Sequence, residues 1–153
     1  MFLPLLLGCT TVFASMAIQI AAVVWMLHYL FTLISSGPRE RTGLGMNTYV
    51  ISIIMLMLFV GHLVQVAIWA LLFMFLGEFE VFDVAFYHSM VNFASLGYGD
   101  IVMTDRWRLL GAIEASNGVL MFGLSAGTLL SVMGRLLEVY KPLKNHQKSS
   151  KKR

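Results

Sequence analysis

Hydrophobic residues in this chain fall into three long runs and one short run, separated by polar breaks. The long runs cover residues 2–34, 48–76 and 109–132, and each exceeds the about 20 residues that a helix needs to cross a bilayer. The short run, residues 82–93, is too short to span a bilayer and too apolar for a loop. The pattern predicts an all-α membrane protein with three transmembrane helices and one re-entrant helix.

The composition favours the same class of protein. Hydrophobic residues make up 58% of the chain and charged residues only 12%, which is typical of a membrane protein. The single cysteine, Cys9, excludes an internal disulfide framework. We find no nucleotide-binding loop, no Ser/His/Asp set and no metal-ligand spacing, and therefore expect no enzyme activity, no cofactor and no nucleic-acid partner.

The first apolar run has two alternative interpretations, both of which involve cleavage. A signal peptide has a basic n-region and a shorter apolar core than this run offers. Residues 6–9 resemble a lipoprotein cleavage box, but few residues and no basic ones precede them. We favour an N-terminal transmembrane helix over residues 1–35.

Polar residues interrupt the first two long runs. Thr11, Ser15 and Gln19 recur every four residues and therefore share one helix face. We expect this face to meet protein, although single hydroxyls can also bond back to their own helix. His62 and Gln65 lie about one turn apart in the second run. Polar residues inside a membrane are functional candidates, and a helix-packing hydrogen bond is the interpretation that we favour for these two.

Residues 95–100 read Ser-Leu-Gly-Tyr-Gly-Asp and follow the short apolar run directly. This filter segment, placed between two spanning runs, resembles the selectivity filter of the pore-loop family of tetrameric potassium channels, written TVGYG. Ser95 stands where that pattern has threonine, and Leu96 where it has valine. The resemblance covers roughly residues 48–140.

The resemblance implies how the filter segment works. Backbone carbonyls of Ser95, Leu96, Gly97 and Tyr98 replace the water around K⁺, and the Ser95 hydroxyl adds the innermost ring. Successive carbonyls face one axis when the backbone alternates with left-handed residues, and Gly97 and Gly99 adopt that conformation cheaply. One strand offers about one oxygen at each level, so the family uses four chains.

The resemblance also implies which side chains brace the filter. The Tyr98 ring points away from the axis, and Asp100 holds the outer mouth. Many relatives carry an acidic residue on the pore helix behind the filter, where this chain has Val91. We hypothesise that Glu114, on the third spanning run, replaces it.

Glu114 would then hydrogen-bond the filter backbone or a hydroxyl such as that of Ser89 or Ser95, whereas the alternative is a snorkelling or water-facing glutamate. Gly118 stands about where relatives have a glycine that lets the inner helix bend, and is a possible hinge.

Four further residues have less specific interpretations. Asp83 suits the first turn of the short helix, because a carboxylate is stabilised at a helix N-terminus. We expect His88 to pack rather than to bind a metal, since no ligand cluster accompanies it. Ser116 and Asn117 are candidates to line the cavity below the filter, but the sequence does not define the rotation of their helix. The acidic turn at residues 78–83 either concentrates cations or is an ordinary solvated turn.

Basic residues predict the topology. Arg39 and Arg41 lie in the first polar break, and lysines crowd the end of the chain. The positive-inside rule places both in the cytoplasm and the N-terminus outside. The tail either contacts anionic lipids or, as we favour, is a solvated topology signal. The predicted segments are an N-terminal helix (1–35), a cytoplasmic loop (36–47), a pore domain (48–140; outer helix 48–76, pore helix 81–94, filter 95–100, inner helix 107–135) and a basic cytoplasmic tail (141–153).

The sequence therefore predicts a homotetrameric, potassium-selective channel in the plasma membrane, the inner membrane in a bacterium, with no bound metal besides permeant K⁺. Two alternatives are a weakly selective monovalent cation channel and a non-conducting membrane subunit with a vestigial pore loop. The first helix lies outside the two-helix pattern, so we expect it to pack on the rim of the tetramer or to serve a partner protein.

Overall fold

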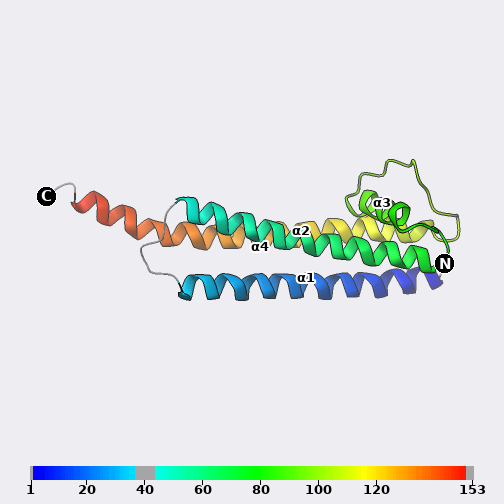
Figure 1. Ribbon diagram of the computed structural model, residues 1–153, viewed down its shortest axis with the longest axis horizontal. Coiled ribbons are helices and arrows are strands. Elements are labelled where there is room, and N and C mark those ends of the chain that lie inside the picture. The colour runs from blue at the N-terminus through cyan, green and yellow to red at the C-terminus, as the bar shows by residue number, and fades with distance from the viewer. Residues whose placement is uncertain (1, 37–43, 151–153) are drawn as a thin grey trace.

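The computed structural model describes the backbone of residues 2–36 and 44–150 and the side chains of residues 2–32 and 48–134. Its elements are α1 (Phe2–Ser36), α2 (Leu44–Phe75), α3 (Phe82–Phe93) and α4 (Arg108–Ser150) (Figure 1). Three stretches are long and apolar enough to cross a membrane: Phe2–Thr32, Thr48–Phe75 and Arg108–Gly134. The described ranges contain no strand, so the predicted all-α membrane fold is confirmed.

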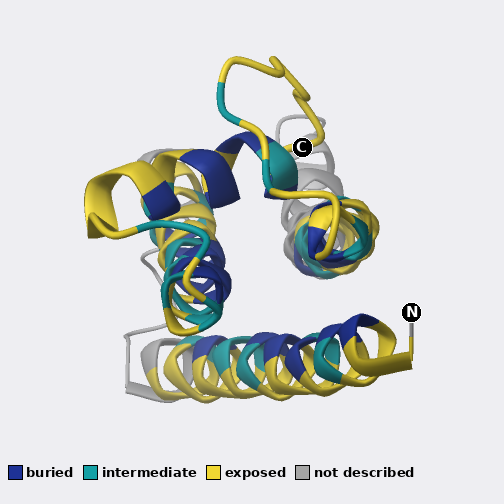
Figure 2. Cartoon of the chain, turned by 90° about the vertical axis from the view of Figure 1, so that its right-hand side faces the viewer, coloured by how far each residue is buried: buried dark blue, intermediate teal, exposed yellow. Residues whose placement is uncertain are grey.

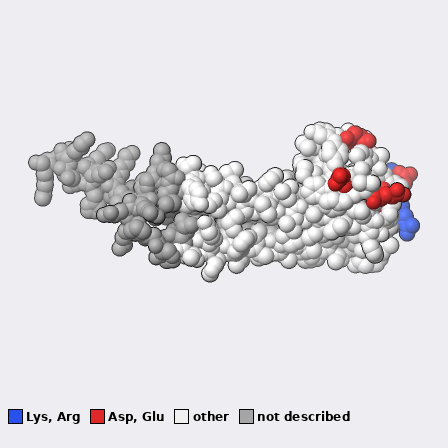
Figure 3. Space-filling model, viewed as in Figure 1, with Lys and Arg blue, Asp and Glu red and all other residues white. Residues whose placement is uncertain are grey.

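The three long helices run along the long axis of the molecule, and α3 lies at one end of it (Figure 1). α1 packs against both α2 and α4, and α3 packs against α2 and α4 as well. The buried residues of α1 line the side of that helix that faces the other two (Figure 2). On the face shown in Figure 3, the charged groups among the described side chains gather at the α3 end. A helix bundle of this kind suits a bilayer, because apolar side chains meet lipid and charges stay at an interface.

A glycine ends α2 and turns the chain toward α3. Gly77 has a φ of 77°, its N–H donates to the Met74 carbonyl at 3.0 Å, and the Glu78 N–H donates to the Phe73 carbonyl at 3.0 Å. These two bonds form a Schellman motif, in which a left-handed residue satisfies the last carbonyls of a helix. Asp83 then lies in the first turn of α3, as predicted from its charge.

Two apolar clusters form the interior of the bundle. The α3-end cluster consists of Val66, Trp69, Phe73, Phe93, Trp107, Leu110 and Met121. The tail-end cluster consists of Met26, Val50, Ile54, Leu58 and Val132. Between them along α1, α2 and α4 lies a set of hydrogen-bonded polar side chains, here called the polar layer: Gln19, His62, Gln65 and Ser125.

The helix ends differ from the predicted segments at two places. α2 begins at Leu44, four residues before the predicted start of the outer helix at 48. α4 begins at Arg108 and continues to Ser150, past the predicted end of the inner helix at 135 and through most of the predicted tail. Leucine and lysine, each at three positions of residues 136–150, favour helix there. Arg39 and Arg41 lie outside the described residues.

Candidate functional site

The filter segment, residues 95–100, connects α3 to the chain that leads into α4, at the α3 end of the molecule (Figure 1). All six residues are exposed in the single chain, and Leu96 and Tyr98 are 54% and 65% exposed. A side-chain carbon added at Gly97 or Gly99 would have no neighbour within 4 Å. One chain therefore leaves this segment without a packing partner.

The backbone of the filter segment alternates in conformation. Ser95, Gly97 and Gly99 have φ values of 57°, 61° and 72°, whereas Leu96 and Tyr98 between them do not have positive φ. The left-handed conformation that we expected at the two glycines is present. The sequence reasoning missed Ser95, because a non-glycine residue rarely adopts positive φ.

The geometry at the end of α3 explains the conformation of Ser95. Its N–H donates to the Asn92 carbonyl at 2.8 Å, and the Leu96 N–H donates to the Val91 carbonyl at 2.9 Å. The first two filter residues therefore close α3 with a second Schellman motif, in which Ser95 takes the position that glycine usually occupies. A β-branched threonine would be more strained at this φ than serine.

The side chains of the filter segment do not all point as the resemblance implies. The Ser95 hydroxyl is directed at the Ala115 carbonyl on α4, at a distance of 3.4 Å, which is long for an O–H donor. Its role as an ion ligand stays a prediction, as do those of the carbonyls and the bracing role of Tyr98.

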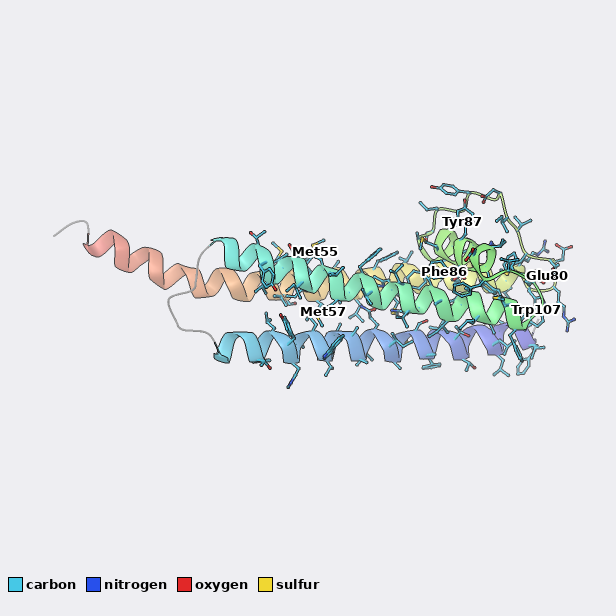
Figure 4. All side chains as sticks on the ribbon, in the orientation of Figure 1. Met55, Met57, Glu80, Phe86, Tyr87 and Trp107 are labelled. Carbon is cyan, nitrogen blue, oxygen red and sulfur yellow. The ribbon has the colours of Figure 1, made fainter. Side chains whose placement is uncertain are left out.

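Asp100 is anchored to α3 at the far end of the filter segment. The Tyr87 hydroxyl donates to Asp100 Oδ2 at 2.7 Å. Figure 4 labels Tyr87 on α3, at the same end of the molecule as Glu80 and Trp107. The hydrogen bond lowers the pKa of Asp100 below its ordinary value and raises the pKa of Tyr87. The filter segment is thus tied to α3 at both ends.

His88 connects α3 to the residue that follows the filter. Its Nδ1 lies 3.0 Å from the Ile101 carbonyl, and its Nε2 lies 2.9 Å from Asn92 Nδ2. A carbonyl only accepts, so Nδ1 carries the proton and Nε2 accepts from the Asn92 amide. The ring also packs against Phe73 and Phe79, with centroids 5.7 and 4.9 Å away. This agrees with the expected packing role and adds a hydrogen-bonding role that the sequence did not indicate.

A carboxylate clasp holds the chain between the filter and α4. Glu78 accepts two hydrogen bonds from Thr104, one from the backbone N–H at 2.7 Å and one from the hydroxyl at 2.5 Å. One residue of the acidic turn therefore has a structural role. Among the described residues, no group of three or more His, Cys, Asp or Glu side chains is placed to hold a metal ion.

Glu114 is fully buried behind α3. Its carboxylate interacts with Ser89 and Asn92, although neither oxygen reaches either partner with good hydrogen-bond geometry. The structure thus brings Glu114 to one of the two hydroxyls proposed for it, while the Ser95 hydroxyl points elsewhere. A fully buried carboxyl group is costly unless it has polar neighbours, so its place beside α3 argues against a snorkelling side chain.

Gly118 lies where α4 touches the end of α3. A side-chain carbon at this position would lie 1.9 Å from the Phe93 carbonyl oxygen, so only glycine allows the two helices to come this close. The hinge role stays a prediction, because α4 is continuous here. The same contact fixes the rotation of α4: Asn117 is 1% exposed inside the subunit, whereas Ser116 is exposed.

Comparison with known proteins places these elements in a family. Residues 53–135 match a protein-family model described as "Ion channel". The match covers more than half of the chain and contains most of α2, all of α3, the filter segment and the first part of α4. Neither a curated protein nor a solved structure matches the chain. The chain belongs to this ion channel family.

Proposed function

We propose that four copies of this chain form a potassium-selective channel that conducts passively. The alternation of left-handed residues at Ser95, Gly97 and Gly99 supports this proposal most directly. Such alternation turns successive peptide carbonyls to one side of a strand, where they replace the hydration shell of K⁺. We assign the ion sites to the carbonyls of residues 95–98.

The exposure of the filter segment supports an oligomer. Irregular backbone at membrane depth is tolerated only where it is buried in protein or lines an aqueous path. A single chain offers neither to Gly97 and Gly99. Four copies around one axis provide both, because each segment then faces the pore and packs against a neighbouring subunit.

The buried carboxyl of Glu114 has the role of a filter support in this proposal. It lies against Ser89 and Asn92 on α3, and Asn92 bonds to His88, which bonds to the Ile101 carbonyl. This chain of contacts reaches from α4 through α3 to the residue after the filter. It keeps the carbonyls in place without contacting an ion.

The proposed orientation follows from charge. The N-terminus lies outside and the C-terminus in the cytoplasm, in the inner membrane if the organism is bacterial, because the arginines of residues 36–47 and the tail lysines favour the cytoplasmic side. The acidic groups at the α3 end then face the outside and attract cations to the mouth (Figure 3).

Ion flux from purified protein tests the proposal. Full-length protein in liposomes should conduct K⁺, and the reversal potential with K⁺ on one side and Na⁺ on the other should show preference for K⁺. Similar permeability for both ions would establish the weakly selective channel instead. No flux from protein that is tetrameric by light scattering would establish the vestigial pore loop.

A further inference from the structure

The polar layer joins α1 to both helices of the pore domain. Gln65 Nε2 on α2 donates to Gln19 Oε1 on α1 at 2.8 Å. Gln19 Nε2 in turn donates to Ser125 Oγ on α4 at 2.8 Å. His62 Nε2 on α2 lies 3.0 Å from the same Ser125 hydroxyl. Gln19 therefore bonds to α2 and α4 at once.

The surroundings of the polar layer fix the register of α1. Gln19 and Gln65 are fully buried, and apolar clusters lie on both sides of them along the bundle. Amide groups in such a place need partners, because water and lipid supply none. Close contact of α1 with α2 continues at Gly61, where an added side-chain carbon would lie 3.4 Å from Ala22 Cβ. A slide of α1 by one residue would break both bonds of Gln19.

The polar layer reaches the base of the filter through His62. The His62 ring packs against Phe122 on α4, with centroids 4.8 Å apart, and against Phe93, with centroids 5.9 Å apart. Phe93 is the last residue of α3, two residues before Ser95, and its carbonyl touches Gly118. The position of Phe93 thus depends on His62 on one side and on α4 on the other.

We propose that α1 is a working part of the channel subunit: Gln19 holds Ser125, Ser125 holds His62, and His62 fixes Phe93 beneath the filter. Gln19 and His62 are positioning residues: neither touches the ion path, and both act through Phe93. This inference rests on the proposed channel function. It goes beyond the family match, because residues 53–135 do not include α1.

The functional test replaces Gln19 with an apolar side chain of similar length. Q19M keeps the volume and removes both hydrogen bonds, whereas I20M changes the neighbouring lipid-facing residue, which is 55% exposed. An interhelical hydrogen bond in a membrane contributes about a threefold change in an equilibrium, so the loss of both should lower the K⁺ over Na⁺ permeability ratio roughly threefold to tenfold. I20M should leave the ratio unchanged.

A disulfide supplies a second, independent readout. The Cβ positions at Ala22 and Gly61 lie 3.4 Å apart, close to the roughly 3.5–4.5 Å of a disulfide. A22C with G61C, in full-length protein carrying C9S, should oxidise within one subunit. Q19M should lower the yield of this bond. Once formed, the bond should restore the permeability ratio of Q19M, because it holds α1 in place without the amide.

The outcomes separate this inference from the proposed function. A permeability ratio of Q19M equal to that of I20M, or a ratio that the disulfide fails to restore, overturns the positioning role. If Q19M does not assemble, S125A, which removes the contacts of Ser125 with both Gln19 and His62, is compared with I20M in the same way. If the unmodified protein does not conduct, the proposed function fails, and the disulfide yield decides whether Gln19 holds α1: equal yields in Q19M and I20M overturn that as well.

Discussion

The filter segment and the polar layer belong to the same subunit, but the single chain buries only the second. Gln19 and Gln65 are fully buried and hydrogen-bonded within one chain, whereas residues 95–100 are exposed and tied down only at their two ends. The difference shows which contacts form within one chain. The contacts that set the helix register lie within one chain, and in the proposed tetramer the packing around the filter comes from other copies. Four predictions test this division.

The largest effect is expected from Gly99→Ala. Its φ of 72° is unfavourable for alanine by about 1–2 kcal/mol in each chain, and this cost recurs in every copy of the proposed tetramer. We expect K⁺ flux to fall by at least about tenfold in liposomes, with the tetramer retained. Gly77→Ala is the matched control, since Gly77 has a φ of 77° and equally open surroundings but lies outside the filter. Equal flux loss in both variants would mean that backbone strain anywhere disables the protein.

The next effect is expected from Gly118→Ala. The added carbon would meet the Phe93 carbonyl at 1.9 Å, and such overpacking costs about 1–3 kcal/mol. Thermal unfolding in detergent should show the loss. Gly123→Ala lies on the same helix with no neighbour within 4 Å and should keep or raise stability. A stable Gly118→Ala protein with altered gating would favour the hinge over the close contact.

Glu114→Ala should have an intermediate effect on conduction. It removes the buried polar group that lies beside Ser89 and Asn92, an effect of about 1 kcal/mol, so flux should fall about fivefold. Glu114→Gln keeps the polar contacts and should restore part of the flux. Thr10→Ala, at an exposed position of α1 whose hydroxyl bonds only to its own helix, is the control. Unchanged selectivity and conduction in Glu114→Ala would remove the proposed filter support.

The smallest effect is expected on the pH dependence of flux, from the bond between Tyr87 and Asp100. The Tyr87 hydroxyl holds the pKa of Asp100 below its ordinary value of 3.8, so the anchored, ionised form persists at neutral pH and is lost as pH falls through the lowered pKa. Tyr87→Phe removes this bond and should move the acid loss of flux to higher pH. Tyr49→Phe on α2 is the control. If the pH at which half of the flux is lost moves downward in Tyr87→Phe, or does not move, the anchoring role of Tyr87 is contradicted.

Periodicity and residue type predicted much of the fold. The lengths of the apolar runs gave three spanning helices and a short one, and the four-residue spacing of Thr11, Ser15 and Gln19 indicated the buried face of α1. His62 and Gln65 took the packing role that their lack of charged neighbours indicated. These features depend on the spacing of residues along one helix, and this spacing can be read from the sequence.

Other features depend on contacts between helices, and the sequence did not determine them. The rotation that buries Asn117 and exposes Ser116, and the approach of Gly118 to Phe93, come from the packing of α4 on α3. The left-handed Ser95 comes from the closure of α3, which overrides the preference of a non-glycine residue. The pairing of Gln19 with Ser125 joins residues far apart in the chain. Motif reading alone could not supply such pairs.

The uninterrupted course of α4 has a mechanical consequence. From Gly118, where it touches the end of α3, to Ser150 the helix extends about 48 Å at 1.5 Å per residue. A pivot of about 5° at that contact moves the far end sideways by about 4 Å. A sideways force on the distal end of α4 therefore acts on the contact with Phe93 through an arm about 48 Å long.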